Sequence, residues 1–345
     1  MDSNTSKIIV GISVGDTNGI GIEIILKTFE DKRMLDFCTP VIFASNRLVS
    51  YHKKNLKLNN NIFSINSLDK IADNKINLMN SWAEDVKIEL GKLTEIGGKF
   101  AYKSLETATN ALKDNHIDVL LTAPISKENI QSEIFNFPGH TEYLEDKLDG
   151  KSLMILIADK LRVGLITGHI PISKIAEKIT PELIKAKVKI MHTSLKQDFG
   201  ITKPKIAILG LNPHCGDNGI IGGEDNEIVR PTIAEIKETG KLIFGPYAAD
   251  GFFGSQTYKQ FDGVLAMYHD QGLAPFKALS FGNGVNFTAG LNKVRTSPDH
   301  GTGFDIAGKN KANPDSFKEA LFTSLQIFKN RKQYAELTKN VLKVK

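Results

Sequence analysis

Residues 261–277 read FDGVLAMYHDQGLAPFK, and this stretch indicates the fold class. Its first part, 261–268, is a short apolar run typical of a strand that is buried on both faces of a mostly parallel sheet. The run ends in three polar residues, His269, Asp270 and Gln271. Because open α/β folds bind ligands beyond the carboxyl ends of their strands, polar side chains at this point indicate a functional site.

The same pattern recurs along the chain. Five other short runs are β-branched or leucine-rich and end in small or polar residues: 7–15, 39–45, 117–124, 161–168 and 203–211. Helix-like segments lie between the runs, at 21–31, 99–115 and 180–200. The last of these has Thr180 as a candidate N-cap, Pro181 at its first position and Gly200 as its stop. This alternation predicts an α/β fold with a mostly parallel sheet.

The composition is that of an ordinary soluble protein. The 345 residues suit two α/β lobes or one large domain. The net charge is only +5, and no arginine-rich block or basic stripe occurs, so nucleic-acid binding is not expected. The N-terminus lacks the pattern of a signal peptide, and no apolar window is long enough to span a membrane. The asparagine- and lysine-rich stretch 52–79 is expected to be a variable surface insertion.

The chain has only two cysteines, Cys38 and Cys215, and no CxxC pair. A disulfide framework is therefore excluded, and this cysteine usage fits the reducing cytoplasm best.

Three histidines follow predicted strands at equivalent positions: His169, His214 and His269. A single such histidine is ordinarily a core or surface residue, whereas three indicate a shared site. Three neutral imidazoles with open coordination positions suit a catalytic divalent metal, usually Zn²⁺, with Co²⁺ or Ni²⁺ as alternatives. Their spacing matches no local metal motif, so the pattern alone leaves the metal site open. Three other histidines are expected at the surface: His52, His116 and His192.

A glycine-rich segment, GDTNGIGIE at 15–23, joins the first strand to a helix. Anions bind to backbone N–H groups at such positions. The segment contains neither GxGxxG nor GK[ST], so it is not a dinucleotide fingerprint or a P-loop. For this segment alone, a tight strand-to-helix turn is the favoured explanation of the glycines.

The C-terminal third carries Lys277, Asn286 and Arg295 at nine-residue intervals. Lysine, arginine and an amide that converge can bind a phosphate or carboxylate, although each could also be an ordinary solvated loop residue. His140 and Thr141 lie in another turn before a helix, within FPGHTEYL at 137–144.

Seven segments, in this order, resemble the 4-hydroxythreonine-4-phosphate dehydrogenase family of pyridoxal phosphate biosynthesis: GDTNGIGIE, TAPISKE, FPGHTEYL, GLNPHCGDNGIIGGED, GPYAADGFF, YHDQGLAPFK and VRTSPDHGTGFDIAGK. The resemblance covers about residues 7–330. It implies a two-lobed α/β/α fold similar to isocitrate and isopropylmalate dehydrogenases. It also implies a homodimer whose active site lies in the cleft between the lobes at the subunit interface. The lobes would comprise 1–140 with 285–345, and 141–284.

The resemblance also implies a reaction. An NAD- or NADP-dependent enzyme with a divalent metal (Zn, Co or Mg) would oxidise the 3-hydroxyl of 4-phosphooxy-L-threonine. The product, 2-amino-3-oxo-4-phosphooxybutanoate, would decarboxylate to 3-amino-2-oxopropyl phosphate. By matching motif, the metal ligands would be His169, His214 and His269. The substrate contacts would be His140, Thr141, Lys277, Asn286 and Arg295.

The resemblance places Asp250 near the substrate. The proton acceptor stays open among Asp250, Asp270 and a metal-bound hydroxide, and no residue is assigned to the cofactor. The sequence departs from the usual family residues at Thr17, Asn18, Ser126, Gly223, Gly303 and Phe304.

Two alternatives remain. The first is a paralogous dehydrogenase of phosphothreonate, phosphoerythronate or an aromatic cis-diol acid. The second is a non-redox three-histidine metal enzyme, such as a hydrolase or an aldolase.

Overall fold

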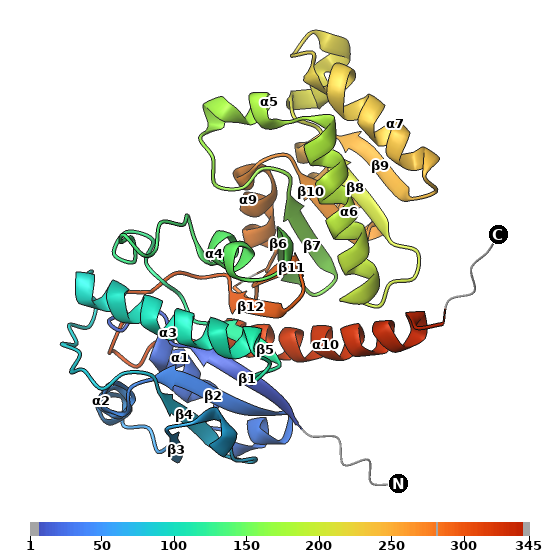
Figure 1. Ribbon diagram of the computed structural model, residues 1–345. Helices are drawn as coiled ribbons and strands as arrows, with labels where there is room; N and C mark the ends of the chain where they lie inside the picture. Colours follow the sequence, from blue (N-terminus) through green and yellow to red (C-terminus); the bar gives the residue numbers. More distant parts are fainter. Residues whose placement is uncertain (1–6, 281, 341–345) are drawn as a thin grey trace. The chain divides into compact units, whose positions relative to one another are not determined.

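The computed structural model describes residues 7–280 and 282–340, and the chain forms two compact units (Figure 1). Unit 1 comprises Met1–Asp149 and Asn292–Phe328, and unit 2 comprises Gly150–Leu291 and Lys329–Lys345. The expected lobes were 1–140 with 285–345, and 141–284, so the internal boundaries differ by seven to nine residues. The segment from Lys329 onward, which was expected in the first lobe, falls in unit 2. The expectation that the chain has no signal peptide rests partly on residues 1–6, which lie outside the described residues.

Within the described residues, unit 1 has six parallel strands in the order β3-β4-β2-β1-β5-β12. Their bounds are β1 Ile8–Ser13, β2 Cys38–Ala44, β3 Ile62–Ile65, β4 Ile76–Asn80, β5 Val119–Thr122 and β12 Val294–Pro298. The helices are α1 Gly21–Thr28, α2 Asn46–Leu56, α3 Glu95–Lys113, α4 His140–Lys147 and the first part of α10 Asp315–Thr338. The expected α/β class is confirmed.

The composition of 52–79 predicted a variable surface insertion, and this prediction is wrong. The stretch contains the end of α2 and the strands β3 and β4. Asn77 lies in β4 and is fully buried. Its side chain accepts a hydrogen bond from the backbone N–H of Ala72 at 2.9 Å and donates to the Ala72 carbonyl at 2.9 Å. A buried asparagine that pairs with backbone groups is compatible with a core strand, although its residue type suggests a loop.

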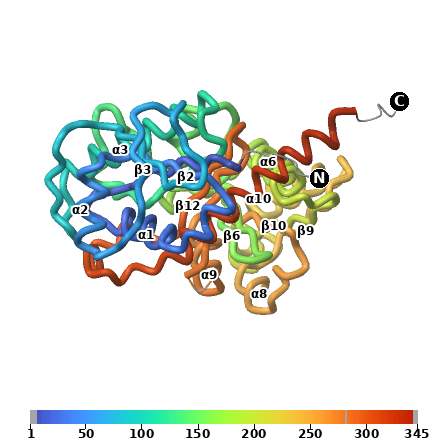
Figure 2. The backbone as a smooth tube through the Cα atoms, turned by 90° about the horizontal axis from the view of Figure 1, so that it is seen from below, coloured from blue at the N-terminus to red at the C-terminus, as the bar shows by residue number. Residues whose placement is uncertain are grey.

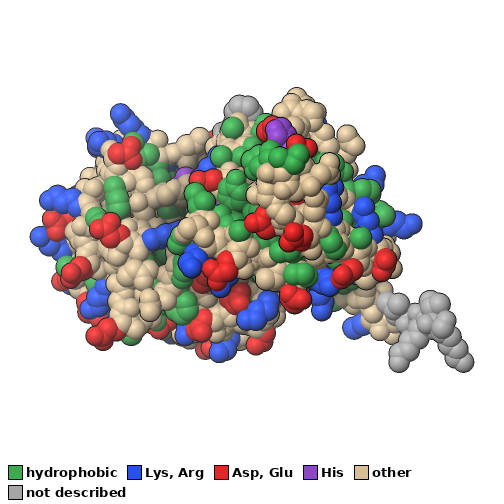
Figure 3. Space-filling model, turned by 90° about the horizontal axis from the view of Figure 1, so that it is seen from above, with side chains coloured by type: hydrophobic (Ala, Val, Ile, Leu, Met, Phe, Trp, Pro, Cys, Tyr) green, Lys and Arg blue, Asp and Glu red, His purple; other side chains and the backbone are tan. Residues whose placement is uncertain are grey.

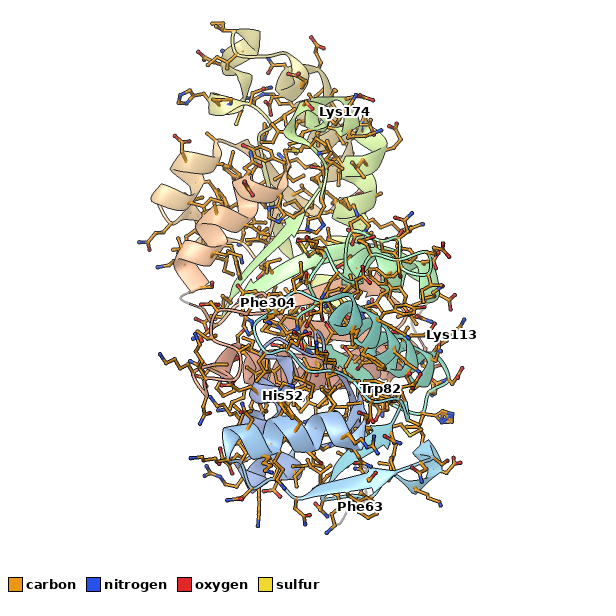
Figure 4. All side chains as sticks on the ribbon, turned by 90° about the vertical axis from the view of Figure 1, so that its left-hand side faces the viewer. His52, Phe63, Trp82, Lys113, Lys174 and Phe304 are labelled. Carbon is orange, nitrogen blue, oxygen red and sulfur yellow. The ribbon has the colours of Figure 1, made fainter. Side chains whose placement is uncertain are left out.

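His52 is another correction, because it is buried on α2 rather than exposed (Figure 4). Its Nε2 atom lies 3.0 Å from the Thr17 carbonyl oxygen. Burial lowers the pKa of His52 to about 4, so the ring is neutral at physiological pH. His116 is exposed, as expected, and His192 is half-buried.

The glycine-rich segment is a tight turn whose glycines are required by close packing. Gly15 has φ +68°, and a Cβ atom there would lie 2.1 Å from the Pro124 carbonyl oxygen. A Cβ atom at Gly21 would lie 2.2 Å from the Val14 carbonyl oxygen. The turn therefore accounts for these glycines without a bound anion.

Unit 2 has six strands among its described residues, in the order β11-β6-β7-β10-β8-β9. Their bounds are β6 Gly150–Ala158, β7 Leu161–Leu165, β8 Lys205–Leu209, β9 Leu242–Tyr247, β10 Gly263–Ala266 and β11 Val285–Leu291. The pairs β11–β6 and β6–β7 are antiparallel, whereas β7, β10, β8 and β9 are parallel. The helices are α5 Ile175–Lys178, α6 Pro181–Gln197, α7 Arg230–Glu238, α8 Ala249–Gly254, α9 His269–Ser280 and the end of α10.

Helices α6 and α9 cover opposite faces of the unit 2 sheet (Figure 1). A Cβ atom at Gly164 of β7 would meet Met191 of α6. A Cβ atom at Gly272 of α9 would meet Val163, the neighbour of Gly164, at 2.9 Å. Successive residues of a strand point to opposite faces, so the two helices lie on opposite sides. Helices α8 and α9 lie on the same side (Figure 2), where Phe252 and Phe276 join one apolar cluster.

The predicted start of α6 is confirmed. The Thr180 side chain accepts a hydrogen bond from the Leu183 N–H at 3.2 Å, and Pro181 occupies the first helical position. Such an N-cap satisfies a backbone donor that has no partner within the helix.

The C-terminal part of α10 is anchored to unit 2 by a buried ion pair. Arg331 donates from Nε to Asp198 Oδ1 at 2.6 Å, and the Asp198 side chain is fully buried. Arg331 also donates from Nη1 to the Leu291 carbonyl at 3.0 Å, and Ser194 donates from Oγ to Asp198 Oδ2 at 2.7 Å. Asn330 donates to the Asp198 carbonyl at 2.6 Å. Asp198 therefore links the end of α6 to α10, and Arg331 extends the link to the end of β11.

On the face shown in Figure 3, basic and acidic side chains are interspersed. None of the helices within residues 7–280 and 282–340 combines the length and apolar character needed to cross a membrane. Cys38 and Cys215 are free thiols, in agreement with the expectation of no disulfide framework, and both are buried.

Candidate functional site

The three predicted metal ligands follow three neighbouring parallel strands of unit 2. His169 follows β7, His269 follows β10 and begins α9, and His214 follows β8. Strand β10 lies between β7 and β8 and pairs in parallel with both. The carboxyl ends of adjacent parallel strands share one edge of the sheet, which is where ligands bind in this class of fold.

His169 and His269 lie side by side. Their ring centroids are 5.4 Å apart, with an angle of 44° between the ring planes. The Nδ1 atom of His269 lies 2.7 Å from Asp270 Oδ1. A carboxylate on one ring nitrogen orients an imidazole and leaves the other nitrogen for a ligand. This contact gives Asp270, one of the candidate proton acceptors, a second possible role.

His214 lies on an unusual turn, which we call the left-handed turn (residues 214–218). All five residues have positive φ: His214 52°, Cys215 55°, Gly216 78°, Asp217 41° and Asn218 56°. For residues other than glycine this conformation costs about 1–2 kcal/mol each, so the surroundings must hold the turn in place. Within it, Gly216 accepts from the Ile221 N–H at 3.0 Å.

Asp225 holds the chain that leads into the left-handed turn. Its side chain is fully buried and accepts hydrogen bonds from the Leu211 N–H at 2.8 Å and the Asn212 N–H at 2.9 Å. Asn212 also donates from Nδ2 to Glu224 Oε2 at 2.9 Å. Sequence reasoning missed Asp225, although the acidic pair Glu224–Asp225 closes a quoted motif and could have drawn attention to it.

Asp250 is exposed, in the first turn of α8. Burial raises the pKa of the Cys215 thiol, and the negative charges of Asp225 and Asp250 raise it further. This interaction places Asp250 near the left-handed turn that carries His214.

The three histidines fit a divalent metal in type, because imidazole nitrogens are preferred ligands of Zn²⁺ and related ions. The structure brings His169 and His269 together, but His214 is not part of this pair. In the described part of the chain, no group of three His, Cys, Asp or Glu side chains is arranged to hold an ion.

Two predicted substrate contacts also belong to unit 2. Lys277 is exposed near the end of α9. Asn286 is the second residue of β11, and its Oδ1 atom is buried without a hydrogen-bond partner among the described residues. A buried acceptor of this kind normally pairs with a protein group, a water or a ligand.

The other three predicted contacts belong to unit 1. Arg295 is not a loop residue, because it lies in β12 and is only 2% exposed. It donates from Nη2 and Nε to Thr122 Oγ1, at 2.6 and 3.1 Å. Burial lowers the pKa of Arg295 to about 9, and the carboxylate of Glu142 partly offsets this effect.

His140 begins α4, and half-buried Thr141 follows it. The His140 Nε2 atom is buried and has no hydrogen-bond partner within the described residues. Burial lowers the pKa of His140 well below its usual value, and the positive charges of Arg295 and Lys127 lower it further. His140 is therefore neutral at pH 7. Lys127 is an additional cation of this site that sequence reasoning did not single out.

Comparison with known proteins identifies the family. The family model described as "Pyridoxal phosphate biosynthetic protein PdxA" matches residues 36–324. A 4-hydroxythreonine-4-phosphate dehydrogenase from Bacteroides thetaiotaomicron is 51% identical over 330 residues, which are 95% of this chain and 91% of that protein. A D-threonate 4-phosphate dehydrogenase from Cupriavidus necator is 35% identical over 94% of this chain and 98% of that protein.

The fold agrees with these matches. The crystal structure of 4-hydroxythreonine-4-phosphate dehydrogenase from Klebsiella pneumoniae superposes with a TM-score of 0.79 at 30% identity, covering 94% of this chain and 100% of that chain. The resemblance inferred from the seven motifs is confirmed. The chain is a dehydrogenase, and it belongs to the family of the pyridoxal phosphate biosynthetic protein PdxA.

Proposed function

We propose that the chain oxidises 4-phosphooxy-L-threonine at its 3-hydroxyl, with NAD⁺ or NADP⁺ as the acceptor and a divalent metal (Zn, Co or Mg) bound by three histidines. The observation that carries the proposal is the placement of His169, His214 and His269 after three adjacent parallel strands. The overall sequence identity to named dehydrogenases of this substrate supports it. A cytoplasmic homodimer that shares its active site belongs to the same proposal.

The reaction needs a hydride acceptor, removal of the hydroxyl proton and stabilisation of the developing alkoxide. When bound, a nicotinamide cofactor supplies the hydride acceptor and a divalent metal supplies Lewis acidity. In unit 2, Asp270 contacts and orients the His269 ring. The acceptor of the hydroxyl proton is Asp250, Asp270 or a metal-bound hydroxide. The oxidised product then loses its carboxylate as CO₂ and leaves 3-amino-2-oxopropyl phosphate.

The remaining residues of the site are proposed to bind the substrate. Neutral His140 can exchange a hydrogen bond through Nε2, and buried Asn286 Oδ1 can accept one from a hydroxyl or ammonium group. The positive charges of Lys277 and Arg295 suit the phosphate and the carboxylate. Groups fixed before binding set the approach geometry of the hydride.

D-Threonate 4-phosphate is the second candidate substrate, because a relative named for that activity is 35% identical over nearly the whole chain. It differs from 4-phosphooxy-L-threonine at C2, where a hydroxyl replaces the ammonium group. Residues that contact C2 therefore decide between the two compounds.

The test is a spectrophotometric assay of NADH and NADPH formation with both compounds, after chelation and after addition of Zn²⁺, Co²⁺ or Mg²⁺. We expect metal-dependent NADH formation with 4-phosphooxy-L-threonine, accompanied by CO₂ release. Turnover only with D-threonate 4-phosphate would assign the second candidate. No reduced cofactor from either compound would contradict both candidates.

Arg295→Ala is expected to raise the KM for the phosphorylated substrate by about 10- to 100-fold, because a hydrogen bond to a charged group contributes about 1.5–3 kcal/mol. It should also lower Tm, since the guanidinium is buried and bonded to Thr122. Steady-state kinetics and thermal unfolding measure the two effects. Arg47→Ala, at a side chain that is 74% exposed, is the control. An unchanged KM in folded Arg295→Ala protein would contradict the assignment.

A further inference from the structure

We propose that Thr122 is a positioning residue that holds the Arg295 guanidinium in place for an anionic group of the substrate. The inference rests on the proposed function, in which Arg295 is a substrate contact, and it assigns a role to a residue that has none above. Thr122 is the last residue of β5 and is fully buried. Arg295 lies in β12, which pairs with β5 in parallel.

The contact between the two side chains fixes one edge of the guanidinium. The Nε and Nη2 atoms of Arg295 both donate to Thr122 Oγ1, at 3.1 and 2.6 Å. Because the guanidinium is planar and rigid, one oxygen that accepts from two of its nitrogens sets both its position and its rotation. A charged group that is ordered before the ligand arrives loses less entropy on binding.

The Thr122 hydroxyl stands on a firmly held part of unit 1. The next residue, Ala123, donates from its N–H to the Ser13 carbonyl of β1 at 2.9 Å. The Asp16 N–H then donates to the Pro124 carbonyl at 3.0 Å. The end of β5 is therefore bonded both to β1 and to the turn that follows β1. Strands hold the groups of a site more precisely than loops do.

A threonine suits this role because its hydroxyl is neutral. Arg331 shows the alternative in the same chain, because its Nε atom donates to the Asp198 carboxylate and the two charges compensate each other. A hydroxyl accepts the same kind of hydrogen bond without cancelling the charge of Arg295. Burial and then this charge lower the pKa of His140, the neighbouring candidate substrate contact. The charge of Arg295 therefore acts where the substrate is expected.

The experiment uses two substitutions of Thr122 that separate its oxygen from its shape. Thr122→Val keeps the branched shape but has no acceptor, whereas Thr122→Ser keeps the hydroxyl and loses a methyl group. The control is Thr296→Val, which changes the fully buried neighbour of Arg295 in β12. The Thr296 hydroxyl donates to the Ala320 carbonyl of α10 at 2.7 Å, so this variant also loses a buried hydrogen bond. Thermal unfolding reports the effect of each change on the fold.

Binding of 4-phosphooxy-L-threonine and of D-threonate 4-phosphate is measured by isothermal titration calorimetry without cofactor, and KM values by the NADH assay. We expect Thr122→Val to bind the substrate about tenfold more weakly and to raise its KM by the same factor, because the guanidinium remains but is displaced. The KM for NAD⁺ should stay unchanged. Thr122→Ser should recover most of the affinity, and Thr296→Val should bind the substrate like the wild type.

A double-mutant cycle shows whether Thr122 acts through the guanidinium. In Arg295→Ala protein, Thr122→Val should have no further effect on substrate affinity, because the group that it positions is already absent. An equal loss of affinity in the presence and absence of Arg295 would refute the positioning role.

The remaining outcomes separate this inference from the proposed function. If folded Thr122→Val keeps the wild-type affinity and KM, the positioning role is refuted while the dehydrogenase stands. If Thr122→Val does not fold, Thr122→Cys decides in the same way, because a thiol of similar size is only a weak acceptor. If the wild type binds either compound but forms no reduced cofactor, the proposed function fails, and the affinities still decide the role of Thr122. If the wild type binds neither compound, both fail.

Discussion

His214→Ala is expected to remove dehydrogenase activity and to weaken Zn²⁺ binding by more than tenfold while the protein remains folded. His214 is one of only three proposed ligands, so its loss leaves the ion with the pair His169 and His269. The side chain is exposed, and its removal opens no cavity in the core. The measurements are kcat/KM, bound metal after dialysis and thermal unfolding.

The matched control for this variant is His116→Ala, which removes another exposed histidine, from unit 1. It should leave activity, metal content and Tm unchanged. Full activity of the wild type after exhaustive chelation would refute the metal role of His214, as would wild-type metal content in the His214 variant.

Asp198→Ala is expected to lower the free energy of unfolding by about 3–5 kcal/mol, because it leaves the charge of Arg331 in a largely buried position without its ion-pair partner. The variant also removes the acceptor of the Ser194 hydroxyl. Urea unfolding followed by circular dichroism measures the loss.

The control for Asp198 is Glu177→Ala, which breaks the exposed ion pair with Lys174. Exposed pairs contribute about 0–1 kcal/mol, so this variant should unfold close to the wild type. A loss for Asp198→Ala no larger than that of the control would show that the buried pair is not a main anchor of α10.

The expected apolar runs coincide with six of the strands, β1, β2, β5, β7, β8 and β10, whereas other strands were missed, among them two that carry polar residues in the core. Residues 261–268 and 203–211 contain β10 and β8, as expected. Strand β4 contains buried Asn77, and β12 contains buried Arg295, and each of these side chains satisfies its polar atoms within the fold. Residue type alone does not show such partners, so 52–79 was expected to be a surface insertion and no strand was expected around Arg295.

For the site, the sequence supplied the positions of the three histidines along the chain but not their arrangement in space. The placement of β10 between β7 and β8 depends on contacts between distant residues, and no local pattern encodes it. The left-handed turn did have a local signal. Asp217 and Asn218 are residue types that tolerate positive φ, and Gly216 adopts it freely.

The left-handed turn also bears on how this protein can be engineered or evolve. Residues 214–218 hold a conformation that is costly for most amino acids, next to a proposed ligand. Substitutions that let this segment relax would raise heat tolerance and would displace His214 at the same time. Thermostable variants selected without an activity screen should therefore accumulate substitutions in residues 214–218. Variants with such substitutions should have lower catalytic activity than the wild type.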